Sequence, residues 1–484
     1  MNGKKIFSNL IWRFFERIGA KLISIVVNLI LARLLAPELF GTVAIVLLFT
    51  EVLTVFIDSG FGTALIQKKD SDDLDFSSVF FFNIVMCAAL YVLLFACAPW
   101  LSRIYHKPEL TKIFRVVGTV LLISGVRNVQ QAYVSRNMLF KRFFFSTLGG
   151  TVSAAVVGIW MAYKGYGVWA YVCQYLVNNL VGTIILWFTV DWRPKMQFSF
   201  QRLKVLFSYG WKLLVSSLLN TISEKLRPLI IGYRFTSSDL AFYNEGMLFP
   251  NLIVENVNAS IDSVLLPALS EQQDSTENVK AMTKRAVQIS SYILWPMMLG
   301  LFACAGSIVK LILGEEWMDC VPFIRIFALY YVLYPIHTAN LNAIKAMGRS
   351  DIFLKLEIIK KIIDVIIVVS TLFIGVKAMA AGLLVDGVLS LLINSFPSKK
   401  LFGYGFLEQL RDIAPTVALA VLMSAAVMAV ELLKLGTLTT LILQILLGVA
   451  IYAAGSVLTK SESLFYVINI AKGLLLKKNE QASE

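Results

Sequence analysis

The chain contains 484 residues, 58% of them hydrophobic and 15% charged, and its mean hydropathy is +0.74. These values exclude a water-soluble globular protein and predict an all-α integral membrane protein. The net charge of +13 is also typical of nucleic-acid binding. However, most lysines and arginines lie in short loops between apolar segments, so we expect no nucleic-acid partner. The five cysteines have neither paired nor metal-like spacing, and we expect no disulfide framework and no metal site.

Windows of about 20 residues predict about fourteen spanning helices. In chain order they cover 11–35, 42–66, 78–101, 111–134, 143–163, 167–190, 208–232, 239–268, 286–312, 321–344, 352–374, 378–397, 412–433 and 438–459. The predicted domains are a first lobe (1–190), a cytoplasmic interfacial linker (191–207), a second lobe (208–401) and a C-terminal helix pair with a tail (402–484). Most basic loop residues fall on the side of the termini, which predicts that both termini are cytoplasmic.

The first predicted span carries a polar stripe. At about 100° per residue, its polar members fall within an arc of about 80°. They are Arg13, Arg17, Lys21, Ser24 and Asn28. A cation near the centre of a span costs about 2.5–3.5 kcal/mol on insertion scales, so such residues usually face a bundle interior or an aqueous path.

The same stripe, with the same spacing, returns in the seventh predicted span. Its members are Lys212, Ser216, Asn220, Ser223 and Arg227. Downstream of the two stripes, Glu51 matches Glu255 and Asp58 matches Asp262 at a constant offset of 204 residues (255 − 51 and 262 − 58). The chain therefore reads as two homologous six-helix lobes, an arrangement typical of transporters with a central site.

The basic and amide residues of the stripes are candidates for binding an anionic substrate group, because Arg and Lys bind phosphate oxygens. Two arginines of other polar spans join them. The predicted substrate-binding residues are Arg13, Arg17, Lys21, Asn28, Arg127, Lys212, Asn220, Arg227 and Arg325. For Arg13, Arg17 and Lys212, the alternative is that the side chains snorkel to the lipid headgroups.

Two pairs of carboxylates are seven residues apart, which places each pair on one helix face. The pairs are Glu51 with Asp58 and Glu255 with Asp262. Buried carboxylates can bind a proton or a sodium ion, because burial disfavours the ionised group. The alternative is a salt bridge to the cationic stripe. We predict ion coupling or gating and leave both explanations open.

A DxD-like group, Asp70 to Asp73, precedes the third predicted span. Such groups bind metals in glycosyltransferases, but a three-letter match is weak and no nucleotide-binding domain adjoins it, so we expect a solvated loop. No connection is long enough for a soluble catalytic domain. We therefore expect no enzyme activity and no catalytic residues.

The segments LARLLAPELFGTVAIV (31–46) and DSGFGTALIQKKD (58–70) resemble the Wzx-like polysaccharide flippases of the multidrug/oligosaccharidyl-lipid/polysaccharide (MOP) superfamily. The branch they resemble includes the colanic acid and teichuronic acid exporters. The resemblance implies the MOP flippase fold, with two six-helix lobes and a C-terminal helix pair.

This resemblance also implies a function. The chain would move undecaprenyl-pyrophosphate-linked oligosaccharides across the bacterial inner membrane by alternating access, for synthesis of O-antigen, capsule or exopolysaccharide. We expect a monomer without cofactor, coupled to a proton or sodium gradient, with membrane lipids, a polysaccharide polymerase and chain-length machinery as partners. The alternative is a drug or cation antiporter of the MATE type, which should favour an acidic, apolar cavity.

Overall fold

The computed structural model describes residues 3–68 and 70–466, without the side chains of residues 3–11, 13–18, 59, 60, 209 and 260. Within these ranges the chain is helical and has no strand, so the predicted all-α membrane class is confirmed. In the same ranges, ten helices are long and apolar enough to cross a membrane, or eleven when the two parts of the bent helix α9 count as one span. The remaining predicted spans are helical but short or polar, so the count of about fourteen stays a prediction.

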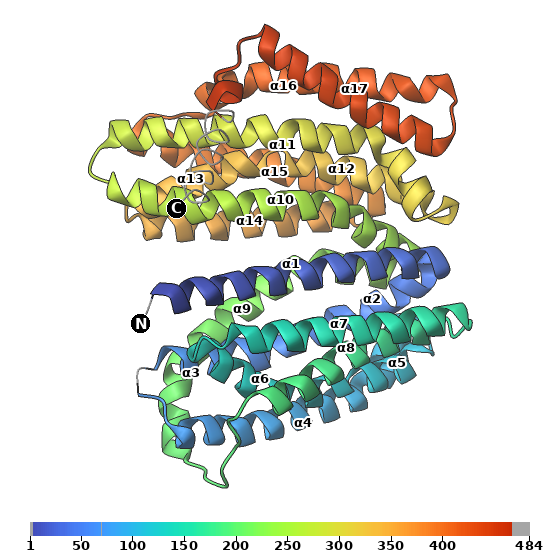
Figure 1. Ribbon diagram of the computed structural model, residues 1–484, viewed down its shortest axis with the longest axis vertical. Coiled ribbons are helices and arrows are strands. Elements are labelled where there is room, and N and C mark those ends of the chain that lie inside the picture. Colours follow the sequence, from blue (N-terminus) through green and yellow to red (C-terminus); the bar gives the residue numbers. More distant parts are fainter. Residues whose placement is uncertain (1–2, 69, 467–484) are drawn as a thin grey trace. The chain divides into compact units, whose positions relative to one another are not determined.

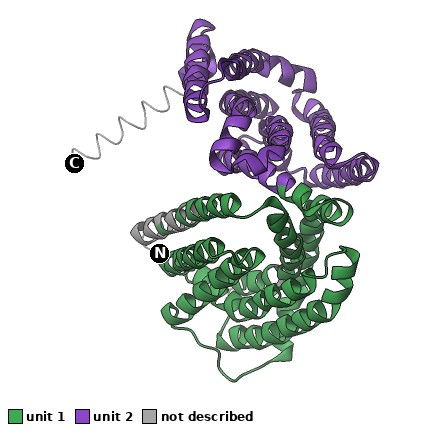
Figure 2. Cartoon of the chain, turned by 90° about the vertical axis from the view of Figure 1, so that its right-hand side faces the viewer, with its two compact units in different colours: residues 1–241 green, residues 242–484 purple. Residues whose placement is uncertain are grey.

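The chain forms two compact units, residues 1–241 and 242–484 (Figure 2). Figure 1 labels the helices. The first unit contains α1 (Gly3–Leu34), α2 (Pro37–Ile57), the π-helical turn η1 (Asp58–Gly62), α3 (Thr63–Gln67), α4 (Asp73–Ile104), α5 (Leu110–Val117), α6 (Thr119–Arg136), α7 (Phe140–Tyr163), α8 (Val168–Thr189) and α9 (Phe200–Arg234).

The second unit begins within α10 (Ser237–Glu271). It continues with α11 (Thr276–Ile312), η2 (Glu315–Cys320), α12 (Val321–Tyr331), α13 (Tyr334–Ala346), α14 (Ser350–Thr371), α15 (Val376–Phe402), α16 (Phe406–Ala429), η3 (Val430–Leu433) and α17 (Thr437–Leu458).

The predicted duplication is visible in the order of elements. The fourth span of each half is broken into two helices, α5 and α6 in the first half and α12 and α13 in the second. The turn after each broken span contains a residue in the left-handed region, Met138 (φ 53°) and Gly348 (φ 71°). Glycine adopts this conformation without the steric cost that a side chain adds.

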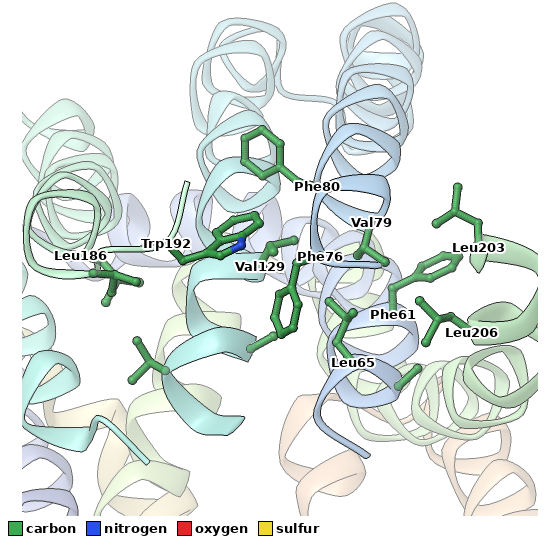
Figure 3. Close-up of a cluster of buried hydrophobic side chains, with 14 of the residues drawn as sticks. Phe61, Leu65, Phe76, Val79, Phe80, Val129, Leu186, Trp192, Leu203 and Leu206 are labelled. Carbon is green, nitrogen blue, oxygen red and sulfur yellow. The ribbon is translucent and has the colours of Figure 1, made fainter. Parts of the chain in front are cut away.

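The apolar core of the first unit includes the connection that follows α8. Trp192 of this connection packs against Phe76 and Phe80 of α4, with ring centroids 5.7 and 6.3 Å apart. Leu203 and Leu206 of α9 lie in the same cluster (Figure 3). α9 therefore packs with the first unit, and that unit contains both helices with a predicted cationic stripe. The division into four predicted domains stays a prediction.

Candidate functional site

The predicted cationic residues lie on α1 and α9. The side chains of Arg13 and Arg17 are outside the described residues. Lys21 and Lys212 are exposed, whereas only 4% of Arg227 is accessible. Snorkelling to headgroups accounts for exposed cations, but it does not account for a buried guanidinium. Arg227 is therefore the stripe residue for which a role inside the protein is best supported.

The two amides of the stripes differ in burial. Asn28 of α1 is half-buried and Asn220 of α9 is exposed. Both make polar interactions in the structure.

Glu51 of α2 forms an ion pair with Lys225 of α9, with 2.6 Å between Oε2 and Nζ. The side chains are 46% and 30% exposed, and pairs with such exposure typically contribute about 0–1 kcal/mol. Glu51 therefore has an ion-pair partner on α9, but not the partner that the salt-bridge alternative expected. The cation, Lys225, is not a member of the predicted stripe.

Asp58 opens the π-helical turn η1. Asn128 Nδ2 of α6 donates a hydrogen bond to Asp58 Oδ1 at 2.9 Å, and Asn83 Nδ2 of α4 donates to Asn128 Oδ1 at 3.3 Å. Both asparagines are buried, and among the described residues Asn83 Oδ1 has no hydrogen-bond partner. A Cβ atom at Gly62 would lie 3.1 Å from Asn128 Oδ1, so a larger residue there would crowd the amide. Single π-helical turns are frequent at functional sites.

Arg127 of α6 lies next to this chain of amides. Its Nη1 donates to Asn179 Oδ1 of α8 at 3.2 Å. When its amide oxygen faces the guanidinium, Gln131 accepts from Arg127 Nη2 at 2.9 Å and Nε at 3.0 Å. Neutral amides therefore fix the direction of this guanidinium, which lies within Coulombic range of Asp58. The arrangement places positive and negative charge near one another in the first unit, where Asp58 is exposed and Arg127 is half-buried.

The second unit repeats the contact made by Asp58. Asn342 Nδ2 of α13 donates to Asp262 Oδ1 of α10 at 2.6 Å. Glu255, two turns earlier on α10, accepts from Asn251 Nδ2 at 2.7 Å. Asp58 and Asp262 occupy equivalent positions of the repeat, and each accepts a hydrogen bond from an amide on the fourth span of its own half.

Arg325 of α12 is held differently from Arg127. Its Nε donates to the backbone carbonyl of Phe302 at 3.3 Å, and its guanidinium lies 5.5 Å from the centre of the Phe302 ring. These contacts join α12 to α11. Arg325 is the one predicted binding residue that belongs to the second unit, and its predicted role in substrate binding stays a prediction.

The sequence analysis identified these carboxylates but not their amide partners. For Asn83 a signal was present, because it is a single amide within the apolar run FFFNIVM (80–86). A buried amide without a partner is costly, so a lone asparagine in a span predicts a polar neighbour on another helix. The identity of that neighbour requires the packing of α4 against α6.

The second unit also has an apolar groove of ≈ 720 Å³ between α11, α16 and α17. Its walls include Tyr292, Pro296, Met423, Gly448 and Tyr452. In the part of the chain that the structure describes, no group of three or more His, Cys, Asp or Glu residues is placed to hold a metal ion.

The chain is similar to a known protein family and to several known proteins. A family model described as "Polysaccharide biosynthesis protein" matches residues 30–322. The chain is 25% identical over 329 residues to the succinoglycan biosynthesis transport protein ExoT of Rhizobium meliloti (strain 1021), covering 68% of this chain and 67% of ExoT. It is 24% identical over 357 residues to the teichuronic acid biosynthesis protein TuaB of Bacillus subtilis (strain 168), covering 72% of this chain and 73% of TuaB.

Among solved structures, the lipid II flippase MurJ in an inward closed conformation has the same fold. The TM-score is 0.74 at 14% sequence identity, and the match covers 95% of this chain and 100% of that chain. The similarity extends over both units of the chain, which confirms the expected flippase fold.

Proposed function

Because the chain belongs to the polysaccharide biosynthesis protein family, we propose that it is a flippase for lipid-linked oligosaccharides. It moves undecaprenyl-pyrophosphate-linked repeat units across the bacterial inner membrane, for synthesis of O-antigen, capsule or exopolysaccharide. The family match over residues 30–322 is the observation that carries this proposal. The membrane fold supports it, because such a substrate keeps its prenyl chain in the bilayer while its polar head crosses.

The polar side chains of the first unit supply groups for the substrate head. In our proposal Lys21, Arg127, Lys212 and Arg227 bind the diphosphate, since guanidinium and ammonium groups donate to phosphate oxygens. Amides such as Asn28, Asn179 and Asn220 suit sugar hydroxyls, because an amide both donates and accepts. Arg13 and Arg17 complete the proposed set on α1.

The carboxylates have separate roles in this proposal. Asp58 and Asp262, each bonded to a neutral amide, couple transport to a proton or sodium gradient. Glu51 holds α2 to α9 through Lys225. Glu255 assists Asp262 from the same helix face. The resulting cycle alternates access between the two sides of the membrane.

The apolar groove of the second unit suits a hydrocarbon chain, because its lining side chains are mostly apolar. We propose that part of the prenyl chain lies there during transport. The substrate is moved without a covalent change, so no catalytic residue or cofactor is required. Both termini lie in the cytoplasm, the chain acts as a monomer, and a polysaccharide polymerase with its chain-length machinery uses the product.

A binding experiment tests the proposal against the antiporter alternative. The purified chain in detergent is titrated with a polyprenyl-diphosphate oligosaccharide and, separately, with a cationic dye. We expect saturable binding of the lipid diphosphate that weakens about tenfold in a Lys21→Gln/Arg227→Gln variant. Binding of the dye alone would contradict the flippase function and favour a drug or cation antiporter.

A further inference from the structure

The connection that leaves the first half is held by the N-terminus of α4. Backbone N–H groups of Lys195 and Ser199 donate to Ser77 Oγ and Ser78 Oγ at 3.0 and 2.9 Å. The Trp192 indole N–H donates to Asp73 Oδ1 at 3.2 Å. The N-terminus of α4 is therefore a docking site for the chain that leads into α9, while Asp72 and Asp73 are still 50% and 48% exposed.

Charge adds to this docking. Lys195 Nζ lies 2.5 Å from Asp73 Oδ2, and Arg202 in the first turn of α9 lies 3.4 Å from Asp72 and 3.7 Å from Asp75. Asp75 is fully buried and also pairs with Lys68 at 2.5 Å. We call these contacts the first clamp. Its acidic side is α4, and its basic side is the segment entering α9.

The second half has an equivalent clamp where it leads into α16. The helix that receives it is α11, which is the third span of its half, as α4 is of the first. Lys280 and Lys284 of α11 pair with Glu408 and Asp412 of α16 at 3.0 and 2.8 Å. Tyr404, in the connection, donates to Asp412 Oδ2 at 2.9 Å. Here α11 is the basic side, and α16 is the acidic side.

A buried amide donates to a backbone carbonyl of each connection. Gln130 of α6 donates to the carbonyl oxygen of Trp192 at 3.1 Å. Asn340 of α13 accepts from Gln409 Nε2 at 3.0 Å, and Gln409 also donates to the carbonyl oxygen of Tyr404 at 2.9 Å. The two clamps therefore share their position and a buried amide at the connection, but they have opposite polarity.

We propose that the opposite polarity of the two clamps directs each connection to its correct receiving helix while this duplicated protein folds. The internal sequence repeat makes α9 the first helix of the second half, but in the structure α9 packs with the first unit. Both receiving helices offer a similar site, so each connection needs a feature that identifies the correct one. If the segment entering α16 docked on α4, its carboxylates would face Asp72, Asp73 and Asp75. Like charges placed together oppose such wrong pairings.

The test reverses the charges on both sides of the second clamp. Both clamps then have the same polarity, and the second clamp keeps its ion pairs. The polarity variant is Lys280→Asp/Lys284→Asp/Glu408→Lys/Asp412→Lys in the full chain with its five native cysteines replaced. Docking is read from disulfide formation between engineered cysteines. Ser78→Cys with Ser199→Cys reports correct docking, and Ser78→Cys with Gly405→Cys reports wrong docking.

We expect wrong docking to rise about tenfold in the polarity variant relative to the parent, since several like-charge contacts are replaced by attractive ones. A neutral control, Glu408→Gln/Asp412→Asn, removes the pairs without attracting α16 to α4, and we expect no rise. Parental crosslinking in a folded polarity variant would overturn the proposal. The proposal would also be overturned if wrong docking rose equally in the neutral control and in the polarity variant. Loss of the ion pairs of the second clamp would then be sufficient to cause it.

Discussion

The two halves make the same carboxylate–amide contact one helical turn apart. Asn128 lies eight residues before the end of α6 at Arg136 (136 − 128), whereas Asn342 lies four residues before the end of α13 at Ala346 (346 − 342). Four residues correspond to about one turn. The contact has thus been kept although its distance from the helix end differs between the halves.

The surroundings of the contact differ more than the contact itself. In the first unit it lies beside a π-helical turn and an arginine that is held by amides. In the second unit the carboxylate lies on a continuous helix, and the large cavity nearby in the chain is an apolar groove. The comparison teaches that duplication supplied two similar frames in which the contact was kept while its surroundings diverged.

The largest effect should come from removing either shared carboxylate. We expect Asp58→Asn and Asp262→Asn each to lower polysaccharide export about tenfold or more, because an amide cannot change its charge as a coupling group must. Export is measured in cells at matched protein levels. Glu51→Gln is the control on the same helix face, and it should lose much less since Glu51 is in an exposed ion pair. Full export by Asp262→Asn alone would restrict coupling to the first half.

A smaller effect separates the arginines of the two units. Arg127→Gln should weaken lipid-diphosphate binding about fivefold, because its half-buried guanidinium is held in position by side-chain amides. Arg325→Gln should leave binding within about twofold and lower the melting temperature, because Arg325 joins α12 to the Phe302 carbonyl. Titration and thermal unfolding on the same samples check both. An equal loss of binding would place the two arginines in one site.

The apolar groove can be narrowed without removing a polar group. A Cβ atom at Gly300 would lie 3.9 Å from the Met423 side chain, in ordinary contact. We expect Gly300→Leu to weaken binding of a long-chain lipid diphosphate about threefold and to leave a short-chain analogue unaffected. Gly300→Ala is the control and should bind both as the parent does. A parallel loss for both analogues would indicate damage to the head site.

The smallest effect concerns the N-caps of the two third spans. Asp72 caps α4 by accepting from the Asp75 N–H, and Ser275 caps α11 by accepting from the Asn278 N–H. Replacing either residue with alanine should cost about 1 kcal/mol of unfolding free energy at neutral pH. The two caps should then differ in their response to acid.

The hydrogen bond from the Asp75 N–H holds the pKa of Asp72 below its ordinary value of 3.8. The contribution of this cap is therefore complete above pH 3.8 and is lost as the pH falls through the lower pKa of the folded state. We expect the cost of Asp72→Ala to shrink on acidification and the cost of Ser275→Ala to stay constant. Chemical unfolding in detergent across this pH range measures both, and the same acid response for the two variants would contradict the assignment.

The features that repeat along the chain can be predicted from the sequence. The carboxylates Asp58 and Asp262 and the two stripes followed from an offset and a helical period, which are local properties of the sequence. Sequence reasoning did not find the partners of Asp58 and Asp262, because Asn128 and Asn342 lie 70 and 80 residues away from them. Such partners are set by how helices pack.

The acidic loop before α4 shows the same limit. Asp72 and Asp73 read as part of a solvated loop because the DxD-like match is weak and no nucleotide-binding domain adjoins it. Their partners Lys195 and Arg202 are 122 and 130 residues away. Likewise, the repeat assigns α9 to the second half, but its apolar face packs into the core of the first unit (Figure 3). The half of the repeat to which a helix belongs therefore does not determine the unit in which it packs.

The π-helical turn at Asp58–Gly62 also limits how mutations can be transferred between the halves. A wider turn changes the azimuth of every residue that follows by up to about 100°, the angle of one residue. Residues before Asp58 and Asp262 can thus be exchanged position for position. After these positions, residues exchanged in a chimera would point in a different direction from the residues they replace, even where both halves have the same residue type.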